Sequence, residues 1–579
     1  MWIIKDSNRI KLPTDSIQRF FIQSWFSLVH MNSLDSHRVR CMNALNIIDE
    51  LVDLCSSEKS GFPKIKDEIT RVALEVADII KDDLIVQDHF SLHWKKIEPL
   101  LRDITTKKPP PPVFSYYLKD LQSKLNINYK GLLIKAIKEE IKTSKNNQRL
   151  YGHIAALLSL LIHDGHSLVE MFAIVRNIFI SNKSSKKFSF DDNLNFTADI
   201  ISREPSQYDI IFRLQGCRKY THLKDILGDK ISQSIELKGA NTDVVGFLNP
   251  AQSVLFAKFR VFAQDDRSAG LKAKRELDGI LDLIRFELEQ HVISTDNEFI
   301  SVREKESTAR RFRLPTIIPN PSRKMEPAHF ENFIGRFNRI FENEGLDTES
   351  KEKVKSALRF YRMGKDSDLF ENKFLNWWTA FEFLTRTGEQ GGVIEEVRGK
   401  LVPMLVLHYL EKHLISYKNA LLVCGVTALA DQTTPVELFT QIHDTQQYQD
   451  IIAQIDEVPV LKFKLNEFKA QTADGKAFCA FHQRHEQHLI WHIHRIWRIR
   501  CDIVHSAQYK LNLNLLSANL EYYLKSLLSL IINQFSSDKG IGSIKELYIR
   551  YQYAHERFVK EMKDGGTDLH ISLLSGEFV

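Results

Sequence analysis

Cysteine is scarce in this chain, and its cysteines form no motif. Six of the 579 residues are cysteines, and no two of them make a CxxC pair. A disulfide framework needs many cysteines and a zinc ribbon needs closely spaced thiols, so the sequence argues against both. This composition predicts a reducing, cytoplasmic location.

Motifs that bind phosphate or carry a nucleophile are also missing. The chain has no GxxxxGK[ST] sequence, no GxGxxG sequence after a predicted strand, and no GxSxG sequence. These absences leave an ATPase, a dinucleotide-dependent enzyme and a hydrolase with a serine elbow without support. The sequence shows no internal repeat of fixed period and no low-complexity segment.

Long apolar runs are absent as well. The longest uncharged apolar stretches, such as residues 419–430, are too short to span a bilayer, and Lys5 and Asp6 interrupt any signal-peptide core. With 43% hydrophobic and 26% charged residues, the composition predicts a soluble globular protein without membrane contact. The net charge of +5 is too small to predict nucleic-acid binding, so any RNA contact must come from a local basic patch.

The apolar pattern predicts a mainly α-helical chain that begins with a helical region at residues 1–195. Apolar spacings of three and four residues predict helices over 16–29, 39–54, 116–141 and 155–180. The prolines of 109–112 predict a stiff connector, and the polar residues of 181–187 predict a loop. No catalytic constellation occurs in residues 1–313, and the hypothesis for them is that they sense infection or hold the bundle inactive.

A small α+β module is predicted at residues 196–313. Its β-branched and aromatic residues predict strands over 208–212, 253–262 and 299–302, with an amphipathic helix over 271–288 between them. The proline-rich segment 314–328 predicts a linker. After it, a helical bundle is expected over 329–579, with helices at 331–343, 350–362, 374–385, 393–414, 485–505 and 511–535.

Histidines cluster in and before the predicted helix 485–505, at positions His482, His485, His488, His492 and His494. His488 and His492 are four residues apart, as two metal ligands on one helical turn would be. However, the HExxH pattern is missing and no third ligand is evident, so a surface helix with solvated histidines and no metal or other cofactor is preferred. A zinc enzyme built on these histidines is the least favoured alternative.

The segment from Arg495 to His505 reads Arg-Ile-Trp-Arg-Ile-Arg-Cys-Asp-Ile-Val-His. An arginine and a histidine a few residues apart can stabilise the developing charge of a phosphate and move its proton, which allows RNA cleavage without a metal. The spacing alone decides nothing. With 32 arginines and 21 histidines, chance supplies about three or four Arg-x4–6-His pairs, and the chain has five.

The helical context of Arg500 is more informative than its spacing. At 100° per residue, Arg500 falls in the middle of the apolar side of the helix, whereas Arg498, Asp502 and His505 share another face. A buried arginine is costly unless it is paired or used, so Arg500 lies at a protein–protein seam, belongs to a site, or follows a break in the helix. A purely structural alternative is that Asp502 pairs with Arg498, with His505 near a helix end.

Two segments of the helical region resemble the HEPN superfamily, and within it the Apea-like branch of bacterial anti-phage defence proteins. Arg500-Cys-Asp-Ile-Val-His505 is similar to that branch's Arg-Asn/Asp-x-Ile-Val-His motif. Asn376-Trp-Trp-Thr-Ala-Phe-Glu382-Phe-Leu384 is similar to the W-x-A-L-E-x-L helix that precedes the motif. The resemblance covers about residues 330–540. Cys501 departs from it, because the branch usually has a polar residue there; either Asp502 takes over that role, or the site is tuned differently, or activity is lost.

The resemblance implies a metal-independent endoribonuclease that acts as an anti-phage, abortive-infection toxin. HEPN domains dimerise so that two motif copies meet, which implies a homodimer, RNA as substrate and a phage-derived trigger. His505 is then the general acid or base, Arg500 stabilises the phosphorane charge, and Asp502 orients one of them. Arg495 and Arg498 are expected to contact the RNA backbone. The alternative is a non-catalytic HEPN-like scaffold that binds RNA or a protein.

Overall fold

The structure, a computed structural model, describes all residues except 1–2, 7–9, 31–41, 58–64, 106–111, 181–187, 216–223, 225–226, 238–239, 251–253, 288–292, 305–307, 315–326, 368, 389–391, 507–512, 538–539, 565–568 and 576–579. It forms two compact units. Unit 1 comprises residues 1–159, 180–182 and 318–579, and unit 2 comprises residues 160–179 and 183–317. This division differs from the one expected from the sequence, because the helices of the first 159 residues pack with the C-terminal helices.

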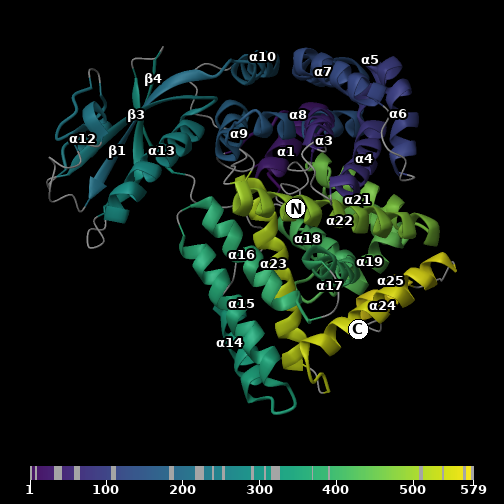
Figure 1. Ribbon diagram of the computed structural model, residues 1–579. Coiled ribbons are helices and arrows are strands. Elements are labelled where there is room, and N and C mark those ends of the chain that lie inside the picture. The colour runs from purple at the N-terminus through teal and green to yellow at the C-terminus, as the bar shows by residue number, and fades with distance from the viewer. Residues whose placement is uncertain are drawn as a thin grey trace. The chain divides into compact units, whose positions relative to one another are not determined.

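The N-terminal helices of unit 1 are shown in purple and blue in Figure 1. Their bounds are α1 (Ser16–Val29), α3 (Ala44–Ser57), α4 (Ile65–Asp82), α5 (Leu84–His89), α6 (Ser91–Thr105), α7 (Pro112–Glu139) with the π-helical turn η2 (Glu140–Ser144), and α8 (Asn147–His163). Helices α3 and α4 pack on each other, α3 packs on α7, and α4 packs on α6.

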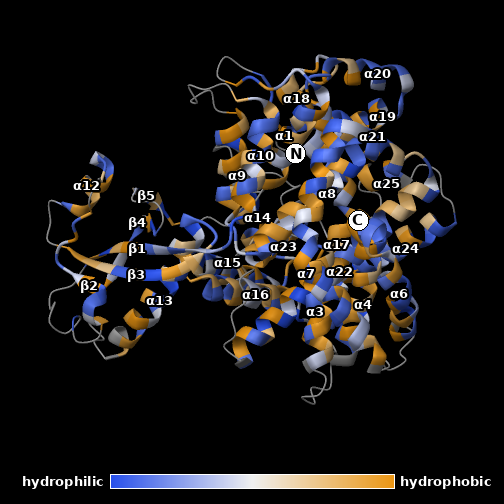
Figure 2. Cartoon of the chain, turned by 90° about the horizontal axis from the view of Figure 1, so that it is seen from above, coloured by the Kyte–Doolittle hydropathy of each residue, from blue (hydrophilic) through white to orange (hydrophobic). Residues whose placement is uncertain are grey.

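The C-terminal helices of unit 1 follow in teal-green, green and yellow (Figure 1). Their bounds are α14 (Pro327–Glu342), α15 (Thr348–Asp366), α16 (Phe370–Thr385), α17 (Val393–Leu407), α18 (Tyr409–Cys424), α19 (Pro435–His443), α20 (Thr445–Gln454), α21 (Pro459–Gln471), α22 (Gly475–Ser506), α23 (Leu513–Ser537), α24 (Ile544–Lys563) and α25 (Leu569–Ser575). Most helices carry apolar residues on one side and polar residues on the other, as Figure 2 shows.

Helix α1 joins the two ends of the chain within unit 1. It packs against α21, where the ring of Phe20 meets Phe463 edge-on at 5.4 Å between centroids. The side-chain amide of Gln23 is buried and donates a hydrogen bond to the Glu457 carbonyl oxygen at 3.1 Å. The first helix of the sequence is therefore part of the C-terminal core.

Helix α22 is the centre of unit 1. It contacts α4, α16, α17, α21, α23 and α24. The Asp474 carboxylate accepts a hydrogen bond from the Ala477 backbone at the start of the helix, and Leu489, Ile493 and Ile496 are buried along it. The helix continues without a break to Ser506. The helices that pack on α22 therefore hold in place the helix whose last turn carries His505.

Helices α15 and α16 form a closely packed pair. The Trp377 indole lies over Gly364 and donates a hydrogen bond to the Tyr361 carbonyl oxygen at 3.0 Å. A Cβ at position 364 would lie 2.5 Å from the indole nitrogen. The absence of a side chain at Gly364 therefore lets the two helices approach each other closely. This pair positions α16 against α17, α22 and α23.

Unit 2 is built around a five-stranded antiparallel sheet of order β2-β3-β1-β4-β5. One face of the sheet is covered by α13, around Phe212, Phe259 and Phe299, and the other by α12, around Ile211, Phe256 and Ile300. The bounds are α9 (Leu168–Val175), η3 (Arg176–Ile180), α10 (Phe190–Ile201), β1 (Ser206–Gln215), η4 (Gly228–Lys230), β2 (Ile231–Ser232), α12 (Thr242–Leu248), β3 (Leu255–Ala263), α13 (Asp266–Glu287), β4 (Ser294–Arg303) and β5 (Ala309–Arg313).

The predicted class, mainly α with a small α+β module, is confirmed. Three predicted helices are wrong in extent. The one over 155–180 is divided at Gly165, whose φ is +99°, the one over 393–414 is divided at His408, and the one over 485–505 begins earlier, at Gly475. The loop at 181–187 and most of the linker at 314–328 lie outside the described residues. No described helix is long and apolar enough to cross a bilayer.

Candidate functional site

The two segments that carry the HEPN resemblance lie side by side in unit 1. Helix α16 contacts α22, and the Glu382 Oε1 atom lies 3.8 Å from Arg500 Nη2. Glu382 is held in place by the Trp378 indole, which donates a hydrogen bond to the same oxygen at 2.6 Å. The sequence pattern named Glu382 only as part of its segment. The structure adds it to the candidate site as the carboxylate that faces Arg500.

Arg500 is half-buried, with 28% of its side chain exposed. Because α22 continues to Ser506, the alternative of a helix break before Arg500 is excluded. Arg500 belongs instead to a charged contact at the edge of the bundle. Next to it, burial raises the pKa of the Cys501 thiol, although the Arg500 guanidinium acts in the opposite direction. The thiol therefore stays protonated at neutral pH.

His505 lies in the last turn of α22 and is exposed, as is its neighbour Val504, while Asp502 is half-buried. Arg500 and His505 are five residues apart, which separates their directions around an ideal helix by about 140°. A single copy of the chain thus presents the two side chains on different sides of α22.

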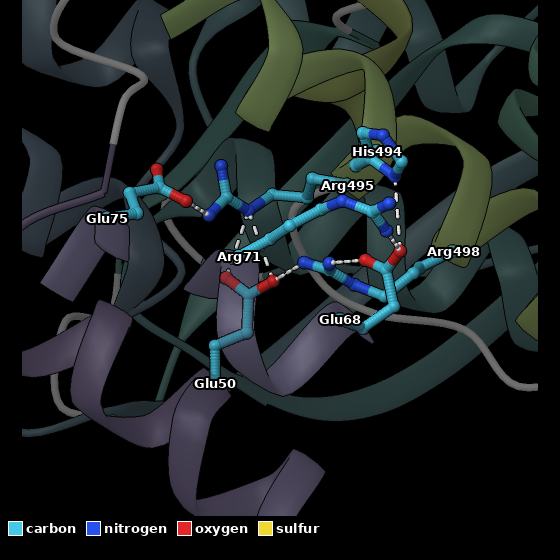
Figure 3. A network of polar contacts seen from close by, with 7 residues as sticks. All are labelled: Glu50, Glu68, Arg71, Glu75, His494, Arg495 and Arg498. Atoms are coloured by element: carbon cyan, nitrogen blue, oxygen red, sulfur yellow. Dashed lines mark hydrogen bonds and ion pairs between the residues drawn. The ribbon is translucent and has the colours of Figure 1, made fainter. Parts of the chain in front are cut away.

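Arg495 and Arg498 lie in a network of ion pairs with helices α3 and α4 (Figure 3). The Arg495 guanidinium is bound between two carboxylates, with its Nε 2.9 Å from Glu50 and an Nη 2.6 Å from Glu75. The Arg498 guanidinium is bound between Glu50 and Glu68. Only 8% and 14% of the two arginine side chains are exposed. In this arrangement their donors are directed at carboxylates of the same chain.

His494 and Arg71 complete the network. The His494 Nδ1 atom is 3.1 Å from Glu68, and Arg71 also pairs with that carboxylate. Burial alone would raise the pKa of Glu68, but the hydrogen bond from His494 and the charge of Arg498 outweigh it and lower the pKa to about 2. Burial would likewise lower the pKa of Arg495, but the charges of Glu50 and Glu75 raise it. Glu68 and Arg495 are therefore charged at neutral pH, whereas burial raises the pKa of Glu75 and lowers the pKa of His494.

The prediction of a surface helix with solvated histidines is wrong for most of the cluster. His482, His492 and His494 are buried, and the ring of His485 stacks on Tyr409 at 3.4 Å between centroids. Burial lowers the pKa of His482 and of His492 to about 3 in each case. These rings are neutral core aromatics, whereas His488 is exposed. The described residues contain no group of three or more His, Cys, Asp or Glu side chains that could hold a metal ion.

A surface hollow of about 420 Å³ lies elsewhere on unit 1, between α22 and α24. Its lining residues are Glu486, His555, Glu556, Val559, Lys560 and Lys563. None of the residues predicted as catalytic lines it.

Comparison of the chain with protein-family models, with curated proteins and with solved structures found no match in any of the three. The residues and contacts of this chain therefore carry the functional argument alone.

Proposed function

We propose that the protein is a metal-independent endoribonuclease of the HEPN type that acts as an abortive-infection toxin against phage. The observation that carries the proposal is the contact between Glu382 of α16 and Arg500 of α22, which lies five residues before the exposed His505. This contact joins the two segments that resemble the HEPN family, in the order and within the bundle that the resemblance requires.

The chemistry is a transesterification at a phosphodiester. His505 removes the proton of the RNA 2′-OH, and the oxygen attacks the adjacent phosphorus. Arg500 stabilises the phosphorane charge, and Glu382 and Asp502 orient the cationic and imidazole groups. The 5′-oxygen of the next nucleotide leaves and takes a proton from the imidazolium of His505, which yields a 2′,3′-cyclic phosphate and a 5′-hydroxyl. Because the attacking group is a 2′-OH, DNA is not a substrate.

The geometry of α22 favours a homodimer. Since Arg500 and His505 point about 140° apart on one helix, a phosphate reaches both more readily where two copies of α22 meet. The arginine of one copy then lies beside the histidine of its partner. This arrangement also gives a use to a half-buried arginine at the edge of the bundle.

A His505→Ala variant tests the assignment. Incubated with total RNA and EDTA, the wild-type protein is expected to produce fragments with 2′,3′-cyclic phosphate ends, and the variant to lose cleavage by about 100-fold or more. The matched control is His89→Ala, which removes an exposed histidine from α5. Equal cleavage by the wild type and His505→Ala would exclude His505 from the reaction.

The non-catalytic scaffold is kept as a second candidate. Arg495 and Arg498, which the ribonuclease was expected to use for the RNA backbone of its substrate, are bound to glutamates. The scaffold predicts that the wild-type protein shifts RNA in a gel, or binds a protein partner, without cutting RNA. The same EDTA experiment separates the two functions, since only the ribonuclease produces new RNA ends.

A further inference from the structure

Four residues of α22 that pair with carboxylates of α3 and α4 follow a regular spacing, and His494, which also pairs with Glu68, lies one position away from it. Positions 484, 488, 491, 495 and 498 are separated by alternating steps of four and three residues, so they lie on one face of the helix. These four are Arg484, His488, Arg495 and Arg498, and the buried Trp491 occupies the remaining position of the spacing. The same steps continue to positions 502 and 505, the aspartate and histidine of the candidate site. We call the stretch from 484 to 498 the basic face of α22.

Helix α4 carries the complementary pattern. Its residues at 68, 71, 75, 78 and 82 also alternate in steps of three and four, and all but Arg71 are acidic. The pairs run antiparallel, from Arg484 with Asp82 at 2.7 Å to Arg498 with Glu68. In a coiled coil these positions are apolar. Here one helix supplies positive side chains and the other supplies carboxylates.

Stability alone does not account for this choice of residues. A buried ion pair is often no more stabilising than apolar side chains of similar volume, because removing charges from water costs free energy. A seam made of leucine and isoleucine would hold α4 on α22 equally well. The charges matter if the face of α22 is at times exposed and needs its arginines for another anion.

We propose that the basic face of α22 is a binding track for the phosphates of single-stranded RNA, and that the carboxylates of α3 and α4 cover it in place of those phosphates. Carboxylate and phosphate oxygens accept the same paired N–H donors of arginine, as Glu50 and Glu75 do from Arg495. The track is about 21 Å long and leads along one face of the helix to His505. Displacement of α3 and α4 opens it. This inference rests on the proposed action on RNA.

The test is RNA binding by the full chain after two of the covering carboxylates are neutralised. A labelled 2′-O-methyl RNA oligonucleotide serves as the probe, because it has no free 2′-OH to be cut, and binding is measured by fluorescence anisotropy. The Glu50→Gln/Glu68→Gln variant is expected to bind about tenfold more tightly than the wild type. The slope of its log association constant against log salt concentration should be steeper by about 1.4, because two more arginines contact phosphate.

The matched control is Glu396→Gln/Glu521→Gln. These two glutamates are also buried and paired with lysines, at 3.6 Å from Lys400 and 3.2 Å from Lys365, but they lie outside the network. The control changes the net charge equally and is expected to leave RNA affinity within about twofold of the wild type. Addition of Arg495→Gln to the Glu50→Gln/Glu68→Gln variant should remove the gain. Equal affinities for the double variant and the control would overturn the proposal.

If the Glu50→Gln/Glu68→Gln variant does not fold, a second variant at the exposed end of the α4–α22 contact tests the proposal. Arg484 and Asp82 are exposed, and exposed ion pairs contribute little to stability, so Asp78→Asn/Asp82→Asn is expected to fold. It should bind the same oligonucleotide about threefold more tightly. An unchanged affinity in this variant would also overturn the proposal.

Cleavage of ordinary RNA by the same variants is measured separately. Tighter binding without any cleavage supports the covered track and contradicts the ribonuclease. Cleavage without a gain in binding supports the ribonuclease and contradicts the covered track.

Discussion

His482 shows why histidine content is a poor guide to a site. Its ring is enclosed by Phe478, Phe481 and Phe558, with centroid distances of 4.6, 5.4 and 5.0 Å. Neither ring nitrogen has a hydrogen-bond partner among the described residues. A neutral imidazole is a small aromatic ring, and this environment selects that form. The prediction of solvated histidines followed from the polarity of the side chain and did not take account of the shape of its ring.

Replacement of His482 by phenylalanine should change the pH dependence of stability. Burial, and then the charge of His555, lower the pKa of His482 to about 3, whereas the unfolded chain has the ordinary value of 6.5. The stabilisation by the neutral ring is therefore complete above pH 6.5 and is lost as the pH falls toward 3. Below pH 6.5, His482→Phe should gain on the wild type by about 1.4 kcal/mol per pH unit.

The measurement is the Tm of both proteins between pH 7 and pH 4.5. His89→Phe is the control, because it makes the same replacement at an exposed histidine. A constant difference in Tm between His482→Phe and the wild type at every pH would show that His482 is protonated equally in the folded and unfolded chains.

At the scale of elements, the sequence predicted individual helices better than it predicted where they end or what they touch. The apolar pattern of α1 gave the observed bounds, Ser16–Val29, because this helix has one strong face and the N-cap Asp15. The breaks at Gly165 and His408 were missed, since apolar spacing continues across both. The charge pattern of α4 could have been noticed, but its partner lies more than 400 positions away in the chain. Only packing brings those two patterns together.

The α15–α16 pair depends on Gly364, so Gly364→Ala should loosen the helix that carries Glu382. An added Cβ would press on the Trp377 indole and break its hydrogen bond to Tyr361. We expect a loss of about 1–3 kcal/mol, seen as a lower Tm. In Gly335→Ala the new Cβ meets no described atom within 4 Å, and replacing a helical glycine should stabilise by up to about 1 kcal/mol. Equal Tm values for the two variants would mean that α15 can shift without cost.

At the scale of the whole molecule, the sequence predicted the class of fold and misjudged the association of its parts. A boundary in composition near residue 314 was visible in the prolines. The sequence did not show that the first 159 residues pack with the C-terminal helices. An amphipathic face such as that of α1 indicates that the face is buried, but it does not indicate which element covers it. The candidate catalytic residues were named from the sequence, whereas Glu382 and the acidic cover of Arg495 and Arg498 required the fold.

A fragment of residues 160–579 should therefore not reach the fold that these residues have in the full chain. It would expose the face of α21 that α1 covers, and it would remove the helices α3 and α4 that cover the face of α22 carrying Arg495 and Arg498. We expect the fragment to be insoluble when expressed alone and soluble when residues 1–159 are co-expressed as a second polypeptide. Soluble fraction and gel filtration measure this. A soluble fragment with the Tm of the full chain would show that the N-terminal helices are dispensable for the bundle.

The glutamates that cover Arg495 and Arg498 belong to the same polypeptide as the arginines they cover. Their local concentration is then set by the chain, at a level on the order of millimolar or more, and not by how much protein a cell contains. A separately made inhibitor would dissociate on dilution, and its protection would fail whenever its synthesis lagged. Glutamates in the same chain cover the arginines equally well at any protein concentration. Uncovering the arginines therefore requires a competing ligand and not a change in the amount of protein.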